Sequence, residues 1–294
     1  FLATTLTQSE EVLTNAVSNV AKVVEEGYEG AEILGIHFEG PYLNKANKGA
    51  QPEEYCVKPN IEQFKRYQKA AHGLIKYITM AVENDEDYAL TKYCSQNNVV
   101  VSIGHSNATY EQAVQAYAHG ARSMTHVYNA MTPFTHRANG LVGGALRIRN
   151  MYGEIICDGN HSTLAALNNF FTSKGPDYSI MITDSLMCKG FPVGTKFDFG
   201  GQEVVIYPDG SAHLVEAGNL AGSTLNVNKG LKILIEDALV PVNYAINACT
   251  SNPARCLHVD DRKGTIGVGY DADLVVLDRD YEVVQTYCKG VGQK

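Results

Sequence analysis

Side chains that can bind a metal ion or move a proton follow the ends of several apolar segments. Glu39 comes directly after "LGIHF", His105 ends "NVVVSIGH", and His126 lies within "SMTHVYNAM". His161 follows "EIICDGN", and Asp184 ends "YSIMITD". Imidazole nitrogen and carboxylate oxygen suit Zn²⁺ and similar divalent ions, and three such ligands leave a coordination position for water. The recurrence of these residue types at segment ends therefore favours a shared metal site.

Each of these residues also has an ordinary structural explanation when it is taken alone. A histidine at a strand end often bonds to a backbone carbonyl group, and a glutamate before Gly-Pro can be a solvated loop residue. If a metal is bound, it would lower the pKa of its water to about 7. Asp184 could then accept the proton of that water and pass it to a leaving group. We expect His37, which precedes Glu39 by two residues, to support the site or to point away from it.

Two further segments carry polar side chains near these positions. Ser106, Asn107 and Thr109 follow His105, and we expect their side-chain oxygens to cap a helix. Arg137 lies in the loop sequence "TPFTHRANG". Arginine binds phosphate or carboxylate with two parallel hydrogen bonds, although a single arginine is more often a surface charge.

The elements that must position these residues alternate between short apolar runs and longer amphipathic patterns. We predict strands at 1–6, 31–38, 74–81, 98–105, 121–127, 153–159 and 178–184, and helices at 8–26, 60–72, 86–96, 109–119, 162–173, 223–238 and 241–250. This alternation favours a parallel sheet covered by helices, in which catalytic groups gather at the carboxyl ends of the strands. Seven strands fit either an open sheet or a (β/α)8 barrel that lacks one strand.

The pattern changes after about residue 195. "KFDFGGQEVVIYPDGSAHLV" predicts a hairpin with a Pro-Asp-Gly turn. The closing segment "GTIGVGYDADLVVLDRDYEVVQTYCKG" predicts short strands of a small β appendage. We interpret "NACTSNPARCLH", residues 247–258, as the end of a helix and assign it no chemistry.

Composition and charge narrow the class of protein. The chain of 294 residues is 45% apolar, which is ample for a buried core, and its formal net charge is −8. This acidic balance argues against nucleic acid or an anionic membrane as a partner. The 7 cysteines form no C-x-x-C pair, which is typical of a reduced, cytoplasmic protein. No apolar stretch has the length of a membrane span, and the first residues lack the pattern of a signal peptide.

Six motifs together resemble a known family. "GIHFEGPYLNKANKGA", "GHSNAT", "THVYNAM", "CDGNH", "ITD" and "LAGSTL" occur in the order found in the N-acetylglucosamine-6-phosphate deacetylases of the amidohydrolase superfamily. The resemblance implies a TIM-type barrel at 1–262, with a β-hairpin insertion at about 197–215, and part of a small β-sandwich domain at 263–294. The likeness begins at Phe1, and the resemblance therefore leads us to expect that the family's N-terminal segment and first barrel strand are missing from this sequence.

The resemblance also implies an activity and a set of site residues. The expected reaction is hydrolysis of the N-acetyl group of N-acetylglucosamine 6-phosphate, with one divalent metal per subunit; zinc is favoured, and iron, manganese or cobalt share its ligands. By this likeness the metal ligands are Glu39, His105 and His126, and Asp184 is the catalytic proton donor and acceptor. The substrate-binding positions are Ala50, Asn129, Ala130, Arg137, His161, Leu220, Ala221 and Gly222.

The family suggests a cytoplasmic homodimer whose partner is a phosphorylated amino sugar. Two other functions remain open at this point. One is another amidohydrolase, acting on a different acylated amine or a cyclic amide. The other is an inactive, incomplete barrel that at most binds a sugar phosphate.

Overall fold

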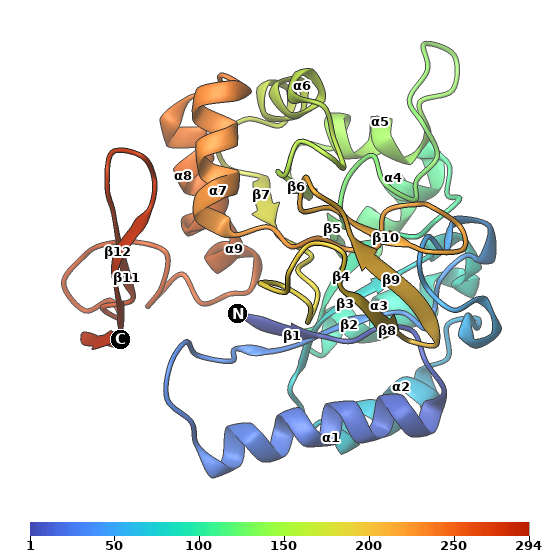
Figure 1. Cartoon of the computed structure of the whole chain (residues 1–294). Coiled ribbons are helices and arrows are strands. Elements are labelled where there is room, and N and C mark those ends of the chain that lie inside the picture. Colours follow the sequence, from blue (N-terminus) through green and yellow to red (C-terminus); the bar gives the residue numbers. More distant parts are fainter. Residues whose placement is uncertain (294) are drawn as a thin grey trace. The chain divides into compact units, whose positions relative to one another are not determined.

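The computed structural model describes residues 1–293 (Figure 1). These residues divide into two compact units, residues 1–151 and 152–293. The strands of each unit are parallel: β1 to β5 lie in that order in the first unit, and β6 pairs with β7 in the second. The first unit holds β1–β5 and the second holds β6 and β7. Each of the seven predicted strands is present, so the predicted α/β class is confirmed.

The strands of the first unit are short, and β2 to β5 are mostly buried, whereas β1 is partly exposed. Their bounds are β1 (Leu2–Thr4), β2 (Gly35–Glu39), β3 (Ile75–Met80), β4 (Val100–Ile103) and β5 (Ala121–Met124). Every residue of β4 is buried, as expected for a parallel strand covered on both faces. The helices of this unit are α1 (Glu10–Glu26), α2 (Ile61–Ala70), α3 (Ala89–Gln96), α4 (Tyr110–Ala118) and α5 (Gly140–Arg147).

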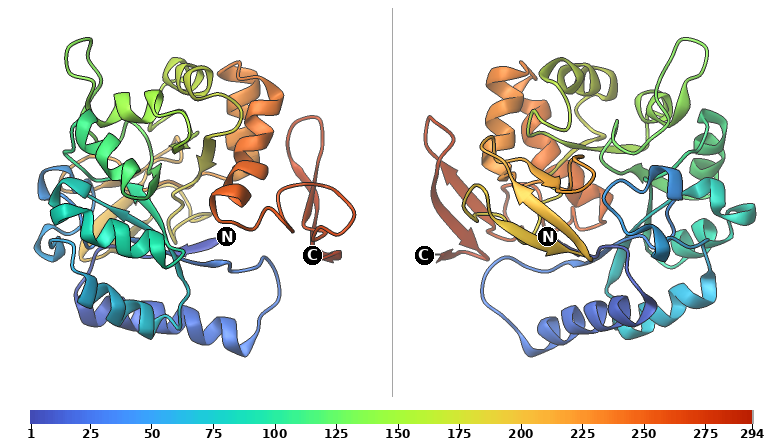
Figure 2. Two further views of the ribbon diagram at one scale, coloured as in Figure 1. Left: turned by 180° about the vertical axis from the view of Figure 1, so that it is seen from behind. Right: turned by 45° about the vertical axis from the view of Figure 1, so that its right-hand side comes forward.

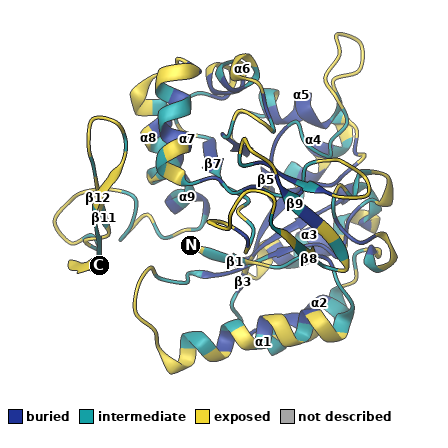
Figure 3. Cartoon of the chain, viewed as in Figure 1, coloured by how far each residue is buried: buried dark blue, intermediate teal, exposed yellow. Residues whose placement is uncertain are grey.

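Helices α1 and α2 lie side by side, as both views in Figure 2 show. The Ser9 side chain caps α1 by accepting a hydrogen bond from the Val12 N–H, and the stripe of Leu13, Val17 and Ala21 is buried. Figure 3 shows the matching exposed outer face of α1. This one-sided burial is what the apolar spacing of residues 8–26 predicts.

Helix α2 contributes the aromatic part of the core. The Asn60 side chain caps the helix at its first turn. The ring of Phe64 on α2 lies 6.4 Å from the ring of Phe38 on β2. The ring of Tyr67 lies 4.9 Å from the same Phe38 ring. This packing holds β2, the strand that ends in Glu39, against the helical layer.

The second unit combines a parallel strand pair with helices and two small antiparallel sheets. Its remaining elements are β6 (Tyr152–Ile156), α6 (Leu164–Lys174), β7 (Ser179–Ile182), β8 (Lys196–Phe199), β9 (Gln202–Ile206), β10 (Ala212–Leu214), α7 (Val227–Lys232), the π-helical turn η5 (Ile233–Asp237), α8 (Val242–Cys249), α9 (Ser251–Cys256), β11 (Leu274–Leu277), β12 (Val283–Cys288) and β13 (Val291–Gln293). Strands β8–β10 form one three-stranded sheet, and β11–β13 form another. The predicted Pro-Asp-Gly turn joins β9 to β10, where the Gly210 N–H donates to the Tyr207 carbonyl oxygen at 2.9 Å.

Two helices differ from the predictions. Helix α5 was not predicted because it contains Gly143 and Gly144, which disfavour helix formation. A Cβ atom at Gly144 would lie 3.1 Å from Met124 and 3.2 Å from Ala113, so tight packing selects glycine there. The prediction that a helix ends within residues 247–258 is confirmed by α8, which ends at Cys249, but the short helix α9, which begins at Ser251, was not predicted.

Within residues 1–293, none of the helices combines the length and the apolar character that crossing a bilayer requires.

Replacing Phe64 by alanine tests the packing of α2 on β2. Because the Phe64 side chain is fully buried, we expect Phe64→Ala to lower the free energy of unfolding by about 3–5 kcal/mol. The matched control is Val12→Ala on α1, where the residue is 49% exposed and the loss should stay within about 0.5 kcal/mol. Urea denaturation measures both changes, and equal effects of the two substitutions would contradict the packing.

Candidate metal centre

Three potential metal ligands meet at the carboxyl ends of strands β2, β4 and β5 in the first unit. Glu39 is the last residue of β2, and His105 and His126 each follow the end of a strand by two residues, β4 and β5 respectively. The Nε2 atom of His105 lies 3.0 Å from Oε1 of Glu39, and Nε2 of His126 lies 3.4 Å from the same oxygen. The two Nε2 atoms are 3.1 Å apart. All three side chains are buried, with exposures of 6–8%.

These distances fit the donor set of a divalent ion. Ligands that each lie 2.0–2.1 Å from a tetrahedral zinc ion are about 3.3–3.4 Å apart. Two imidazoles and a carboxylate are also the ligand types that zinc and related metals prefer. The residues present therefore suit a divalent metal ion.

A backbone contact fixes the orientation of the His105 ring. The Nδ1 atom of His105 lies 2.8 Å from the backbone carbonyl oxygen of Asn47, and because a carbonyl can only accept, Nδ1–H is the donor. The opposite nitrogen, Nε2, faces Glu39 and would offer its lone pair to a metal ion when one is bound. A metal-binding histidine is commonly held in this way by its second nitrogen.

The backbone at two of these positions is unusual. The φ angle is +47° at His105 and +34° at His126, in a region that non-glycine residues seldom adopt. Each such residue costs on the order of 1–3 kcal/mol, and residues of this kind cluster at functional sites. At both positions the backbone therefore adopts an unfavourable conformation in which the imidazole side chain reaches the candidate site.

Glu39 is ionised in this environment. Burial by itself would raise the pKa of Glu39, but hydrogen bonds with His105 and His126 and the charges of those rings outweigh it. The pKa of Glu39 is therefore held well below its usual range. An ionised carboxylate is the form that binds a metal.

A layer of hydroxyl groups lies next to the three ligands. Nε2 of His37 lies 2.8 Å from Oγ1 of Thr79, which lies 2.7 Å from Oγ1 of Thr125, which in turn lies 2.6 Å from Oγ of Ser102. Gly104 directly follows β4, and a Cβ atom at this position would lie 2.8 Å from the side chains of both Thr79 and Thr125. The absence of a side chain at Gly104 therefore allows these hydroxyls to meet.

His37 is part of this layer and supports the site from within. It lies on the same face of β2 as Glu39, because residues two apart on a strand share a face. Burial lowers the pKa of His37 to about 4, so the ring is neutral near pH 7. The alternative, that His37 points away from the site, is wrong.

The helix-capping prediction after His105 is right for one residue of three. Thr109 caps α4 and forms a capping box with Gln112. Ser106 and Asn107 instead bond to the carboxylate of Glu83, on a different segment. That long-range contact replaces the predicted local cap.

The predicted substrate-binding residues of the first unit lie on loops. The side-chain amide of Asn129 donates to the His126 carbonyl oxygen at 3.3 Å, and Ala130 accepts from Ser106 N–H at 3.1 Å. Both are thereby linked to segments that carry metal ligands. Ala50 is half-buried, and Arg137 lies in an exposed loop before α5.

In the second unit, Asp184 and the Leu220–Gly222 segment lie next to each other. Asp184 follows β7 with a φ of +49°, and its carbonyl oxygen accepts a hydrogen bond from Ser223 N–H at 2.7 Å. Ser185 and Ser223 also form a parallel bridge. The structure therefore brings together a predicted catalytic residue and a predicted substrate loop.

His161 has a partner that the sequence analysis missed. Its Nδ1 atom lies 2.7 Å from Oδ2 of Asp158, and Oδ1 of Asp158 accepts from the backbone N–H groups of Asn160 and His161. These bonds hold the pKa of Asp158 below its ordinary value, although burial opposes them. The spacing of aspartate and histidine in "DGNH" was the available signal.

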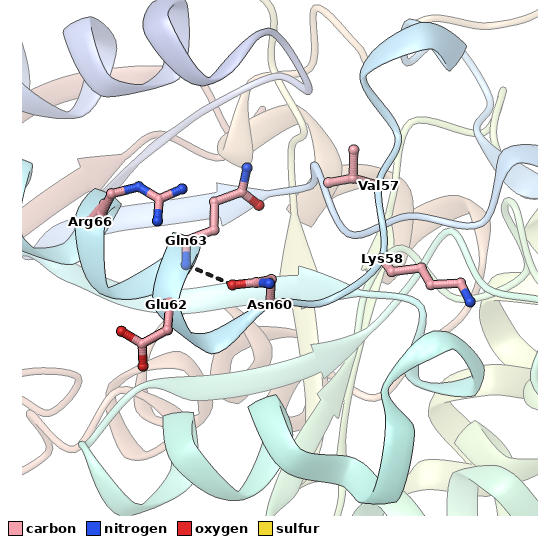
Figure 4. A pocket seen from close by; sticks show the side chains of 6 residues that line it. All are labelled: Val57, Lys58, Asn60, Glu62, Gln63 and Arg66. Atoms are coloured by element: carbon pink, nitrogen blue, oxygen red, sulfur yellow. Dashed lines mark hydrogen bonds between the residues drawn. The ribbon is translucent and has the colours of Figure 1, made fainter.

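A surface pocket of about 380 Å³ lies elsewhere in the first unit (Figure 4). It opens at the start of α2, where the Asn60 side chain accepts from Gln63 N–H at 2.9 Å. Arg66 on its wall is paired with Glu10 at 2.7 Å. None of the predicted site residues lines this pocket.

Comparison with known proteins shows the family to which the chain belongs. The Amidohydrolase family model matches residues 2–291. The chain belongs to the amidohydrolase family. A Bacillus subtilis (strain 168) N-acetylglucosamine-6-phosphate deacetylase is 40% identical over 293 residues, which cover 99% of this chain and 73% of that relative. An Escherichia coli O157:H7 N-acetylgalactosamine-6-phosphate deacetylase is 32% identical over 290 residues, covering 99% of this chain and 76% of that relative.

A solved structure agrees with these relatives. It is a Mycobacterium smegmatis N-acetyl-D-glucosamine-6-phosphate deacetylase in which one aspartate is replaced by alanine, in complex with N-acetyl-D-glucosamine-6-phosphate. The TM-score is 0.92 at 29% identity, and the match covers 99% of this chain and 75% of that chain. The resemblance inferred from the six sequence motifs is thereby confirmed.

Replacing Glu39 by glutamine tests the metal centre directly. The change keeps the size of the side chain but removes its negative charge, so we expect the affinity for Zn²⁺ to fall on the order of 100-fold or more. Glu62→Gln, on the exposed start of α2, is the control and should bind zinc as the unchanged protein does. Elemental analysis and zinc titration measure the effect; full zinc occupancy of Glu39→Gln would contradict the assignment.

Proposed function

We propose that this chain hydrolyses the N-acetyl group of N-acetylglucosamine 6-phosphate, yielding glucosamine 6-phosphate and acetate. The observation that carries the proposal is the convergence of Glu39, His105 and His126 within 3.0–3.4 Å in a chain of the amidohydrolase family. The names of the relatives supply the substrate class. A metal-dependent amide hydrolase is the enzyme class that these findings support.

The residues have distinct roles in this reaction. Glu39, His105 and His126 would hold the metal, which when bound supplies an activated water and polarises the amide carbonyl. The Asp184 carboxylate accepts a proton as the water oxygen bonds to the carbonyl carbon. Asp184 then delivers that proton to the amide nitrogen as the C–N bond breaks, so that the amine leaves in protonated form.

Other residues would bind the substrate. Arg137 provides the charge-assisted hydrogen bonds that a 6-phosphate requires. His161, held by Asp158, would contact the sugar. The remaining contacts in the proposal come from Ala50, Asn129, Ala130, Leu220, Ala221 and Gly222.

N-Acetylgalactosamine 6-phosphate is the second candidate substrate. The Escherichia coli relative, 32% identical, carries that name. The two sugars differ only in configuration at one hydroxyl group, so the metal centre does not distinguish them. Comparing kcat/KM for the two epimers decides between the substrates, and acetate release from neither would refute the proposed reaction.

Several finer expectations also remain proposals. We propose zinc as the native ion, one per subunit, with iron, manganese and cobalt as alternatives. A cytoplasmic homodimer, a TIM-type barrel over residues 1–262 and part of a small β domain at 263–294 belong to the same proposal. The three-stranded sheet of β11–β13 is the feature that favours the small β domain.

Replacing Asp184 by asparagine separates proton transfer from metal binding. The amide cannot accept and return the proton, so we expect kcat to fall by about 10²–10⁴-fold. Zinc affinity should stay unchanged, because Asp184 is not among the proposed ligands. Asp260→Asn, at an exposed position of the same unit, is the control. An Asp184→Asn enzyme that retains full kcat would overturn the assigned role.

Replacing Arg137 by alanine tests recognition of the phosphate. Loss of charge-assisted hydrogen bonds should lower kcat/KM for N-acetylglucosamine 6-phosphate by about 10–150-fold, mainly through KM. Turnover of unphosphorylated N-acetylglucosamine should hardly change, so the preference for the phosphorylated sugar should shrink. Arg149→Ala, also exposed, serves as the matched control. An undiminished preference in Arg137→Ala would exclude this arginine as the phosphate ligand.

A further inference from the structure

Glu83 joins two loops that are far from each other in the sequence. It lies in η3 (Val82–Asn84), the short turn that follows β3. Its carboxylate accepts hydrogen bonds from the Asn44 side-chain amide at 2.8 Å, the Ser106 hydroxyl at 2.6 Å and the Asn107 backbone N–H at 2.5 Å. Asn44 follows β2, whereas Ser106 and Asn107 follow β4. One carboxylate thus connects the loops after both strands.

Both loops make direct contact with the candidate ligand His105. The Asn44 N–H donates to the His105 carbonyl oxygen at 2.9 Å. Asn44 also caps the short helix η1 (Lys45–Asn47), which ends at the residue whose carbonyl receives Nδ1–H of His105. The Asn47 side chain completes the link by donating to the Ser106 carbonyl oxygen at 2.6 Å. The ring and the backbone of His105 are therefore both held by segments that Glu83 ties together.

His105 needs such support for two reasons. Its positive φ is a conformation that persists only where the surroundings impose it. Its ring orientation depends on a carbonyl group in the loop between β2 and α2, which by itself has only short helical turns to order it. Hydrogen bonds to an ionised carboxylate are shorter and stronger than neutral ones, so Glu83 is suited to fix this loop.

We propose that Glu83 is a positioning residue for metal binding. It acts through Asn44 and Ser106 to hold the Asn47 carbonyl on Nδ1–H of His105, which aims the Nε2 lone pair at the metal. The inference rests on the proposed metal site and extends it to a residue that does not touch the ion. A purely structural role would stabilise the fold without altering the geometry at the metal.

The test compares Glu83→Gln with Glu86→Gln, an exposed glutamate three residues further along. In Glu83→Gln an amide NH₂ replaces one acceptor oxygen and faces groups that are themselves donors. We expect its affinity for Zn²⁺ to fall by about 10–100-fold, as is usual for the outer partners of metal ligands. The visible absorption spectrum of the Co²⁺-loaded protein should change as well, because it reports the geometry of the ligands. Glu86→Gln should leave both measurements unchanged.

Asn47→Ala provides an independent second variant. It removes the other tie between the same two loops, so its effect on Zn²⁺ affinity should be coupled to that of Glu83→Gln rather than additive. If Glu83→Gln does not fold, Asn44→Ala, which removes one donor to the carboxylate, must reduce the affinity and alter the Co²⁺ spectrum.

The outcomes distinguish the inference from the function on which it rests. If the unchanged protein binds neither Zn²⁺ nor Co²⁺, the proposed metal site itself fails. If the unchanged protein binds metal and the foldable Glu83 or Asn44 variant shows the same affinity and the same Co²⁺ spectrum, the positioning role is overturned.

Discussion

The structure of the site depends on one constraint: the fold holds the electron-pair donors of Glu39, His105 and His126 close together although these atoms repel one another. The Nε2 atom of His105 and an oxygen of ionised Glu39 face each other at 3.0 Å, away from water. Two such electron-pair donors repel at this distance unless a proton or a metal ion lies between them, and a low dielectric constant strengthens that repulsion. The arrangement is therefore favourable only with positive charge present, and the remaining features of the first unit hold the donors in place for it.

Strand register is the first of these features. In the β4–β5 pair, Ile103 lies opposite Met124, so His105 and His126, each two residues further on, reach the same level. In the β2–β3 pair, Glu39 lies opposite Thr79, which in turn lies opposite Ser102 of β4. A slip of one residue would turn the side chains of a strand to the opposite face. The buried strands fix the register through their apolar side chains, and the ligands follow from it.

The strands and the candidate ligands could be predicted from the sequence because both leave local patterns in it. Apolar runs marked each strand, and the chemistry of Glu39, His105 and His126 marked their ends. Features that depend on contacts between residues distant in the sequence could not be predicted in this way. Helix α5 was not predicted because glycine disfavours a helix, and the close approach of Met124 and Ala113 to Gly144 is a tertiary contact that no local pattern records. The carbonyl group of Asn47 has no residue type that could reveal it, and Glu83 is 23 or more residues from its partners.

The two units carry different parts of the proposed chemistry. The complete donor set, its supporting contacts and Arg137 belong to Phe1–Met151, whereas Asp184 and Leu220–Gly222 belong to Tyr152–Lys294. In this proposal, metal affinity is a property of residues in the first unit, and proton transfer depends on a side chain from the second. The neutral His37 and its hydroxyl partners add no charge beside Glu39. The negative charge of Glu39 thus remains available to a cation, which is the condition for two buried histidines and a carboxylate to act as a metal site.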